Sequence, residues 1–511
     1  MEWTEIAIGV CALMFGAYYW LTANYDFWRS RGVAGPAPRL FFGNLSDMFF
    51  GKLSFGEYLK RIYDANPNEA MLGIYMTRNP ALVLMNPEMI KDVLIKDFST
   101  FSDRGLKTFD RAEPLSQHLV NLEPARWRPL RNKLSPVFTS GKLKKMFYLL
   151  LECGEHLEEY LKKLTLRDEP VECRELTAKF TTDVIGTCAF GLQMNALADE
   201  ESEFRKMGRE IFTPDWRKMI KFRIRDFTPW LYSLLGPVIT DWKMTNFFMK
   251  IMRDSVNYRK NNNVVRHDFI DLIMELRDNP DKLGDIGERH FIYDDPLFKL
   301  TDTLLTAQLF VFFLAGFETS STTMSHALYE LAQNQTIQEK LRAEINTELA
   351  KSKGELTYES IKSMKYLHMV FQETLRKYPP ATLLIRKSTE QYTFSGTKLT
   401  LPKGSRIIVP VFAIHRDPKI YPKPDVFDPE RFTDEAIAAR HPMSWLAFGD
   451  GPRNCIGARF ANYQSKVGLI KILQHYKVEV CDKTQIPYVI DSKSFLLAPT
   501  KGIHVKISKV H

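Results

Sequence analysis

A glycine-rich segment with one cysteine, at residues 448–457, constrains this chain more than any other feature. It reads FGDGPRNCIG, so three glycines flank Cys455 immediately before a predicted helix. Glycine lets the backbone take left-handed turns and approach a flat ligand closely. Nearby backbone N–H groups, the N-terminus of the following helix and Arg453 favour a thiolate at Cys455.

A lone thiolate predicts a particular kind of metal site. With no second cysteine or histidine beside it, Cys455 is a poor zinc or iron–sulfur ligand but a good single axial ligand for haem. An inert cysteine in a glycine turn is the alternative for this segment taken alone. The other five cysteines are far apart and form no CxxC, which is typical of free thiols in a reducing compartment.

Composition excludes several classes of protein. The 511 residues are 45% hydrophobic and 26% charged, which is globular and not disordered or fibrous. Lys+Arg is 70 and Asp+Glu is 61, a net charge of +9 that favours acidic partners. Zinc-ligand spacing and basic runs interleaved with aromatic residues are absent from the sequence, so we expect no nucleic-acid partner.

The N-terminus predicts a membrane anchor. Residues 6–21 are nearly all apolar, and no charge falls between Glu5 and Asp26, a run at the short end of what crosses a bilayer. Acidic residues precede the run, whereas Arg29 and Arg31 follow it, which places the body in the cytoplasm. A cleaved signal peptide fits poorly because no basic residue precedes the run. An aromatic belt is expected at its end, from Trp20, Tyr25 and Trp28.

We therefore expect a transmembrane anchor at residues 1–24, a basic, proline-rich linker at 25–40 and one domain at 41–511. Hydrophobic periodicity predicts that this domain is mainly helical with a minor β part. Expected elements are a hairpin at 72–85, a helix starting at Asn86-Pro87, helices at 301–333, 361–378 and 457–475, small β structure at 393–412, and irregular chain at 279–300 and 415–432. Residues 212–242 mix Lys and Arg with large apolar side chains, and they predict either ordinary helix surface or a shallow second membrane contact beside a substrate entrance; those apolar residues are Trp216, Phe222, Phe227, Trp230 and Leu234.

The 448–457 segment resembles the haem-binding loop of cytochromes P450, FxxGxRxCxG, at every fixed position. Three further motifs follow the order of that family: WxxxR at residues 127–131, the oxygen-activation motif AGFET at 315–319, and ExxR at 373–376 with PERF at 429–432. The resemblance runs from the proline-rich segment to the end of the chain. Residues 134–143 look most like the animal microsomal, xenobiotic-metabolising clan, and within it an insect family-6-like branch.

This resemblance implies a cytochrome P450 fold, with a single haem-thiolate monooxygenase domain behind the anchor, and haem b (iron protoporphyrin IX) as cofactor. Cys455 would be the axial ligand of the haem iron, and Arg131, Arg386 and Arg453 would pair with the propionates. The remaining implied cofactor-binding residues are Trp127, Arg104, Phe448, Gly449, Gly457, Ala315 and Gly316. Glu373, Arg376 and Arg431 are assigned to structure.

Two residues of the oxygen-activation motif are expected to move protons. The Thr319 hydroxyl can bond back to a helix carbonyl, order a water and relay protons toward the haem iron. Glu318 would carry protons from the bulk side, although a polar helix face explains this pair equally well when taken alone. Small side chains at Ala315 and Gly316 would leave room for O2.

The pocket should be apolar. The resemblance to cytochromes P450 implies that its walls come from the loop 104–120 and from eight further positions. Those positions are Phe310, Phe313, Ala315, Ala381, Leu383, Leu384, Leu496 and Leu497. The substrates would be lipophilic small molecules: xenobiotics, plant toxins, insecticides or endogenous lipophiles.

The sequence contains no GxGxxG and no flavin motif, so electrons must come from outside. NADPH would supply them through NADPH–cytochrome P450 reductase, with cytochrome b5 as a second donor. A basic docking face is expected from Lys133, Lys142, Lys144, Lys145, Arg459 and Lys466. The expected location is the endoplasmic reticulum membrane, single-pass, with the catalytic domain facing the cytosol. Alternative functions are a haem-thiolate isomerase or dehydratase of the same fold, and a haem carrier or sensor without turnover.

Overall fold

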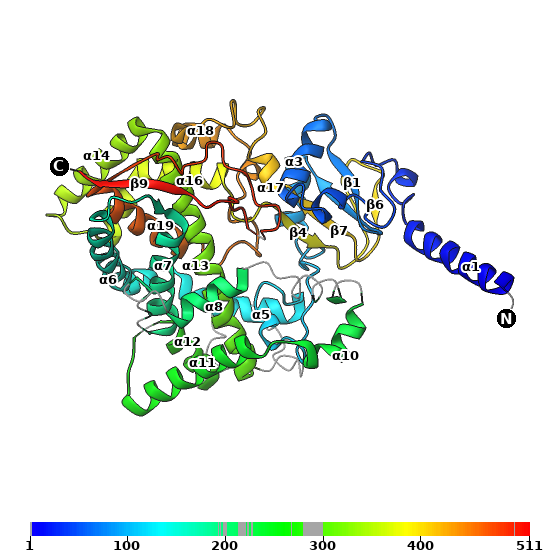
Figure 1. The fold of residues 1–511 in the computed structure, drawn as a ribbon, viewed down its shortest axis with the longest axis horizontal. Coiled ribbons are helices and arrows are strands. Elements are labelled where there is room, and N and C mark those ends of the chain that lie inside the picture. The colour runs from blue at the N-terminus through cyan, green and yellow to red at the C-terminus, as the bar shows by residue number, and fades with distance from the viewer. Residues whose placement is uncertain are drawn as a thin grey trace.

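The computed structural model describes residues 3–192, 194, 196–197, 202–212, 221, 224–225, 228–266, 268–278, 300–494 and 496–510. A long N-terminal helix, α1 (Trp3–Thr22), leaves the body as an isolated rod (Figure 1). None of its residues is buried, and it is long and apolar enough to cross a membrane. A second helix, α13 (Asp302–Gln333), passes the same test, but its apolar stretch is mostly buried inside the body.

Helices make up most of the body. In chain order they are α2 (Ser46–Phe49), α3 (Phe55–Ala65), α4 (Pro87–Lys91), α5 (Pro124–Leu134), α6 (Ser140–Thr165), α7 (Cys173–Ile185), α8 (Glu203–Phe212), α10 (Pro229–Ile239), α11 (Lys243–Asn262), α12 (Phe269–Asp278), α13, α14 (Gln335–Lys351), α15 (Tyr358–Ser363), α16 (Lys365–Lys377), α17 (Val411–Ile414), α18 (Asp434–Ala438) and α19 (Ala458–Leu473).

Three small sheets complete the fold. The largest has the order β1-β2-β7-β4 and lies at the end of the body next to α1 (Figure 1). Within it β1 and β2 form an antiparallel hairpin with Met71 opposite Leu84, β2 runs parallel to β7, and β7 pairs antiparallel with β4. The strands of the three sheets are β1 (Met71–Met76), β2 (Asn79–Leu84), β7 (Arg406–Val409) and β4 (Leu384–Lys387); β3 (Val171–Glu172), β9 (His504–Lys509) and β8 (Tyr476–Glu479); β5 (Tyr392–Thr393) and β6 (Thr400–Leu401).

Helix α13 is the centre of the helical core. The side chain of Thr301 caps its first turn by accepting a hydrogen bond from the Leu304 N–H. Its long apolar stretch then packs against α7, α11, α16 and α19, so most of its length is buried. A second apolar cluster lies under the β1-β2-β7-β4 sheet, and the site described below lies where helices and sheet meet.

Most of the predicted elements are confirmed. The hairpin forms, Asn86 caps α4 with its side chain, α13 begins after Thr301, and residues 415–432 contain only a short 3-10 turn, Pro429–Phe432. The single helix expected at 361–378 is wrong, because α15 and α16 are separate. The Glu344 carboxylate of α14 accepts the N–H groups of Tyr366 and Leu367 and so caps a new helix there.

The chain after the anchor, expected to be a basic, proline-rich linker, packs on the folded body. Trp28, expected in an interfacial aromatic belt, is only 3% exposed and donates from Nε1 to the Ile74 carbonyl at 3.0 Å. A Cβ added at Gly73 would meet the Trp28 ring at 2.2 Å, so the indole lies directly on β1. The Gly73 N–H also donates to the Ala34 carbonyl at 2.7 Å, so this segment belongs to the folded body. Of the apolar residues named for 212–242, Trp216, Phe222 and Phe227 lie outside the described residues, as do residues 279–299 of the expected irregular chain.

Candidate functional site

The Cys455 loop is held by backbone contacts that require its glycines. Gly449 and Gly451 have φ of 68° and 73°, in the left-handed region. A Cβ at Gly451 would meet the Leu94 carbonyl oxygen at 1.8 Å, so no other residue fits there. The Cys455 N–H donates to the Phe448 carbonyl at 2.8 Å, which closes the loop three residues before α19 begins.

The Cys455 side chain is exposed, yet burial is the largest influence on its pKa. An exposed thiol within dense protein implies an internal space next to the sulfur. Burial raises the pKa of Cys455, while the Gly457 N–H, Arg131 and Arg104 lower it by less. The sequence predicted a thiolate from the loop alone; in the protein the thiol is favoured until a cation such as a metal ion lies against the sulfur.

Four arginines surround this space and come from four parts of the chain: Arg104, Arg131 on α5, Arg386 on β4 and Arg453. Arg131 donates to the Asn454 carbonyl at 3.1 Å, Arg104 to the Arg453 carbonyl at 3.0 Å, and Arg453 to the Leu122 carbonyl at 2.9 Å. All these acceptors are neutral, and none of the four arginines forms an ion pair with a carboxylate among the described residues.

Within the described part of the chain, this arginine cluster therefore lacks an anion. Arg453 Nε and Nη1 and Arg386 Nε are buried without a hydrogen-bond partner from that part. Burial, together with the neighbouring Arg104, lowers the pKa of both Arg386 and Arg453 to about 9. Burial likewise lowers the pKa of Arg104 to about 10. Buried guanidinium groups require counterions, so the donor set fits a ligand with two carboxylates, such as a haem with its propionates.

On α13, a short exposed stretch interrupts an otherwise buried helix. Ala315 is exposed, and Leu314, Gly316 and Thr319 are half-buried, although residues before and after them are buried. The Thr319 hydroxyl donates to the Ala315 carbonyl at 2.6 Å, which is the back-bond that the sequence predicted, and the helix continues through it. Gly316 also has a packing role, because a Cβ there would meet Ile185 Cδ1 of α7 at 2.2 Å.

Glu318 points away from Thr319. It is 4% exposed, and its carboxylate accepts a hydrogen bond from the guanidinium of Arg174 on α7. The Arg174 side chain is 29% exposed. The two residues predicted to move protons thus lie on different faces of α13, with Glu318 linked to the surface through Arg174.

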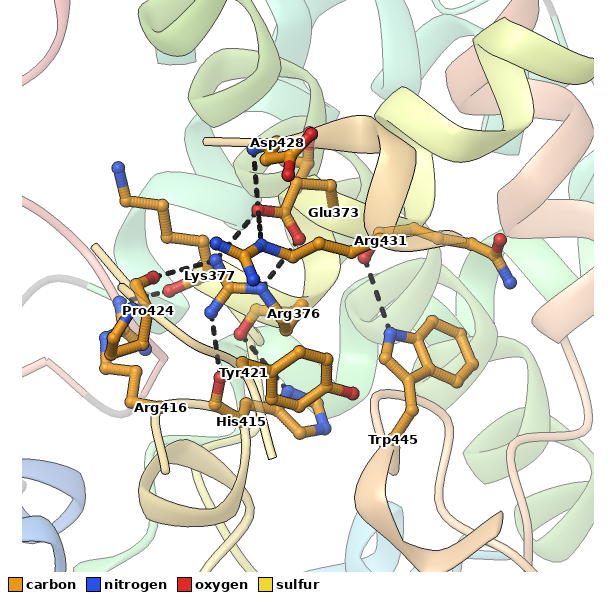
Figure 2. A network of polar contacts seen from close by, with 12 residues as sticks. Glu373, Arg376, Lys377, His415, Arg416, Tyr421, Pro424, Asp428, Arg431 and Trp445 are labelled. Carbon is orange, nitrogen blue, oxygen red and sulfur yellow. Dashed lines mark hydrogen bonds and ion pairs between the residues drawn. The ribbon is translucent and has the colours of Figure 1, made fainter. Parts of the chain in front are cut away.

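Below the cysteine loop, the three residues assigned to structure form one buried network (Figure 2). Glu373 and Arg376 on α16 are fully buried and paired through two hydrogen bonds of 2.6 and 2.8 Å. Arg431 approaches the same carboxylate at 3.6 Å, and the Asp428 N–H donates to it at 2.9 Å. The network therefore fixes the irregular segment before the cysteine loop against α16.

His415 connects this network to the cysteine loop and was not singled out from the sequence. Arg376 donates to the His415 carbonyl at 2.8 Å, and the His415 ring accepts the Leu446 N–H at Nε2, also at 2.8 Å. Burial, with the nearby Arg376 and Arg416, lowers the pKa of His415 to about 3, so the ring is neutral and can accept this bond. Its location in a polar, irregular segment gave no sequence signal of burial.

The predicted pocket residues divide into two groups. Phe310, Leu383 and Leu384 are half-buried and Ala381 is exposed, as pocket walls require. Leu496 and Leu497 are buried, and the Leu497 N–H donates to the Pro380 carbonyl at 3.2 Å, which places them beside Ala381. Phe313 is fully buried, with ring centroids 5.5 Å from Phe248 and 4.9 Å from Phe317, and we assign it to the core.

The predicted basic docking face is partly wrong. Lys142, Lys144, Lys145 and Arg459 are exposed, whereas Lys133 and Lys466 are each only 4% exposed. The helical periodicity of α5 and α19 turns these two lysines inward.

Comparison with known proteins agrees with this geometry. The family model "Cytochrome P450" matches residues 33–507. The chain is 40% identical to cytochrome P450 6a2 of Drosophila melanogaster, over 99% of each chain. It is 40% identical to cytochrome P450 6A1 of Musca domestica, over 99% of this chain and 97% of the relative, and 39% identical to cytochrome P450 6k1 of Blattella germanica, over 98% and 96%.

Proposed function

Because the chain belongs to the cytochrome P450 family of monooxygenases, we propose that it inserts one oxygen atom of O2 into lipophilic small molecules, with electrons from NADPH delivered by a separate reductase. One observation carries this proposal. Four arginines that have no carboxylate partner among the described residues surround a space into which the Cys455 thiol is exposed, as a haem with two propionates requires. A haem held there by the Cys455 thiolate would supply the activation of O2 and the cleavage of its O–O bond.

Each of the site residues has a defined task in this proposal. Cys455 binds the iron, and the loop glycines allow the flat cofactor to approach the backbone. Arg104, Arg131, Arg386 and Arg453 neutralise the propionates, and Trp127 orients Arg453. Because these side chains come from α5, β4 and two loops, cofactor binding joins segments that are distant in the sequence.

Proton delivery is proposed for Thr319 and Glu318. The Thr319 hydroxyl donates its proton to the Ala315 carbonyl, which fixes its orientation and leaves its oxygen free to accept a hydrogen bond at the exposed stretch of α13. Glu318 would receive protons from the surface, and its pairing with Arg174 supports this role because the Arg174 side chain is 29% exposed. Release of this pair would then be part of each turnover.

The electron donor would dock on exposed cations near the segments that flank the cysteine loop. Lys142, Lys145 and Arg459 are exposed, and Lys144 is exposed but paired with Glu359 at 2.9 Å. Complementary charge of this kind steers association and weakens with salt. We propose NADPH–cytochrome P450 reductase as the main donor and cytochrome b5 as a second.

We propose that α1 anchors the protein in the endoplasmic reticulum membrane with the catalytic domain in the cytosol. Complete exposure of this 20-residue apolar helix supports an anchor. A shallow second contact is proposed at α10, where Trp230 and Leu234 are 69% and 70% exposed. Lipophilic substrates that partition into the bilayer would reach the pocket from this side.

A reconstituted turnover assay tests the proposal. Full-length haem-loaded protein, reductase and NADPH are incubated under 18O2 with a panel of lipophilic compounds, with a matched series lacking reductase. The proposal expects products that carry one 18O atom and that form only with both reductase and NADPH. An isomerase or dehydratase would form product without either, and a carrier would bind compounds with no NADPH consumption; either result overturns the proposal.

A further inference from the structure

A cluster of one carboxylate and three donors lies outside the site described above. Glu113 belongs to the loop 104–120, and its carboxylate receives the Tyr232 hydroxyl at 2.8 Å, the Lys221 ammonium at 2.8 Å and the Arg225 guanidinium at 3.3 Å. Tyr232 lies on α10, and Lys221 and Arg225 lie in the chain just before it. One side chain of the loop therefore holds three groups of a single neighbouring segment.

Apolar packing surrounds this cluster and is small. Phe109, Ala112 and the fully buried Tyr232 form a separate apolar cluster, in which the rings of Phe109 and Tyr232 meet edge to face at 4.8 Å. A Cβ at Gly236 would meet the Ala112 Cβ at 2.4 Å, so the loop and α10 are in close contact there. Among the described residues only these three side chains are buried there, with the half-buried Ile224 packed against them, and the charged contacts of Glu113 add to what holds α10 on the loop.

The other parts of the loop are fixed to the candidate haem site. Its first part is bound through Arg104, which donates to the Arg453 carbonyl. Its last part is bound to α13, because Gln308 accepts the Leu119 N–H at 2.9 Å and donates to the Gln117 carbonyl at 2.9 Å. The ring centroids of His118 and Phe310 lie 6.3 Å apart, so this part of the loop lies beside a predicted pocket residue.

The charges around Glu113 favour contact between α10 and the loop 104–120. Burial raises the pKa of Glu113, but Lys221, Tyr232 and Arg225 together outweigh burial and hold the pKa below its usual range. The side chains of Glu113, Lys221 and Arg225 are 20%, 28% and 30% exposed, so salt and water can reach the contacts. Ion pairs of this exposure are strong enough to favour the contact between α10 and the loop, and weak enough to break by thermal motion.

We propose that Glu113 is a specificity-determining latch: its contacts with Lys221, Arg225 and Tyr232 hold α10 against the loop 104–120 and limit the access of large lipophilic substrates to the pocket. Small molecules pass without opening it. This inference rests on the proposed function for the identity of the pocket, but the latch itself is a property of the chain.

Ligand-binding kinetics test the latch in the full-length, haem-loaded protein. The probes are imidazole, which is small, and a bulky azole such as clotrimazole, both followed by the optical shift on binding haem iron in stopped flow. In Glu113→Gln the carboxamide keeps hydrogen-bonding atoms but loses the charge. We expect association and dissociation rates of the bulky azole to rise about tenfold together, with imidazole rates and thermal stability unchanged.

The salt dependence of the bulky-azole rates distinguishes loss of an ion pair from loss of apolar packing. Between about 10 mM and 1 M salt the screening length falls from roughly 30 Å to 3 Å, so bulky-azole rates of the wild type should rise and those of Glu113→Gln should stay flat. Glu169→Gln, an exposed carboxylate distant in sequence, matches the change in net charge and should behave as wild type. Tyr232→Phe removes only the neutral hydrogen bond and should keep the salt dependence.

The outcomes separate the latch from the proposed function. Unchanged bulky-azole rates in Glu113→Gln, or the same salt dependence as wild type, overturn the latch. If no variant gives an optical shift with either azole, the haem assignment fails instead. In that case amide hydrogen exchange at residues 109–116 decides: faster exchange in Glu113→Gln than in Glu169→Gln supports the latch, and equal exchange overturns it.

Discussion

The guanidinium carbon of Arg453 lies 4.2 Å from the centroid of the Trp127 ring, so an arginine of the cysteine loop is stacked on an indole from α5. A cation over an aromatic face is stabilised without losing its hydrogen-bonding groups. Trp127 thereby holds Arg453 in one orientation, while Nε and Nη1 have no partner among the residues that the structure describes. Two motifs that are distant in the sequence thus form one anion-binding arrangement.

Arg453→Leu should weaken cofactor retention. The substitution removes two buried donors, Nε and Nη1, that have no partner among the described residues, so the loss should appear in the holo-protein and not in the apo-protein. We expect haem to dissociate at least tenfold faster, measured as transfer to an excess of apomyoglobin. Arg459→Leu, an exposed arginine of α19, is the control. Equal dissociation rates in the two variants would contradict the assignment of Arg453 to a propionate.

Thr319→Val should separate electron flow from product formation. The variant keeps the shape of the side chain but removes the hydroxyl that bonds the Ala315 carbonyl. Haem content should be unchanged, product per NADPH should fall roughly tenfold to a hundredfold, and hydrogen peroxide should account for the difference. The matched control is Thr323→Val, because Thr323 makes the same bond one turn later, to the Thr319 carbonyl at 2.8 Å. An equal fall in product per NADPH in both variants would show that the effect comes from a change in helix structure and not from the Thr319 hydroxyl.

Lys466→Met should stabilise the protein at neutral pH. Burial lowers the pKa of Lys466 to about 8, and the nearby Glu344 compensates only in part. Because the unfolded lysine titrates near pH 10.4, the unfolded state binds more protons between about pH 8 and 10, and stability rises with pH across that window. Below pH 8 the buried ammonium of Lys466 is charged, and it lowers the free energy of unfolding by about 3 kcal/mol.

Lys466→Met has no buried charge at this position. Its denaturant midpoint should therefore exceed that of the wild type most at pH 7, and the difference should shrink toward pH 10. An advantage that does not change with pH would show that the gain comes from packing alone. Reductase affinity should be unaffected, because the lysine is only 4% exposed. Lys142→Met, at an exposed position of α6, should lower that affinity.

Truncation should distinguish the anchor from the folded body. Removing residues 3–22 should release most of the protein from membranes while leaving thermal stability unchanged, because no side chain of α1 is buried. Removing the chain through Trp28 should instead destabilise the body, as should Trp28→Ala by about 3–5 kcal/mol, since the indole fills space over β1. Sedimentation with vesicles and thermal unfolding measure the two effects. Equal stability of both truncations would contradict the packing of Trp28.

Local signals made much of the fold and site predictable. Asn86-Pro87 and Thr301 are side-chain caps that act on the next few residues, and both start helices where the sequence indicated. The Cys455 loop depends on glycines within the same ten residues, and its left-handed turns follow from them. Such features can be predicted from the sequence because the residue that caps or turns the chain lies within a few residues of the backbone that it affects.

Contacts between distant segments could not be predicted. Glu344 divides a predicted helix by capping α16 from α14, and Trp28 lies on β1 rather than in an interfacial belt. Glu318 is held by Arg174 of another helix, and Lys466 is turned into the core, although the sequence places this lysine on an exposed docking face. In each case a partner from another element decides the position of the side chain, and nothing in the local sequence identifies that partner.

The most direct test of the account is the spectrum of the reduced, carbon monoxide-bound protein, compared between the wild type and Cys455→Ala. A thiolate pushes electron density onto haem iron and shifts the Soret band of this complex to the long wavelength that is characteristic of the family. The account predicts that shifted band in the wild type and its complete loss in Cys455→Ala. A shifted band that persists without Cys455, or a wild-type protein that binds no haem, would contradict it.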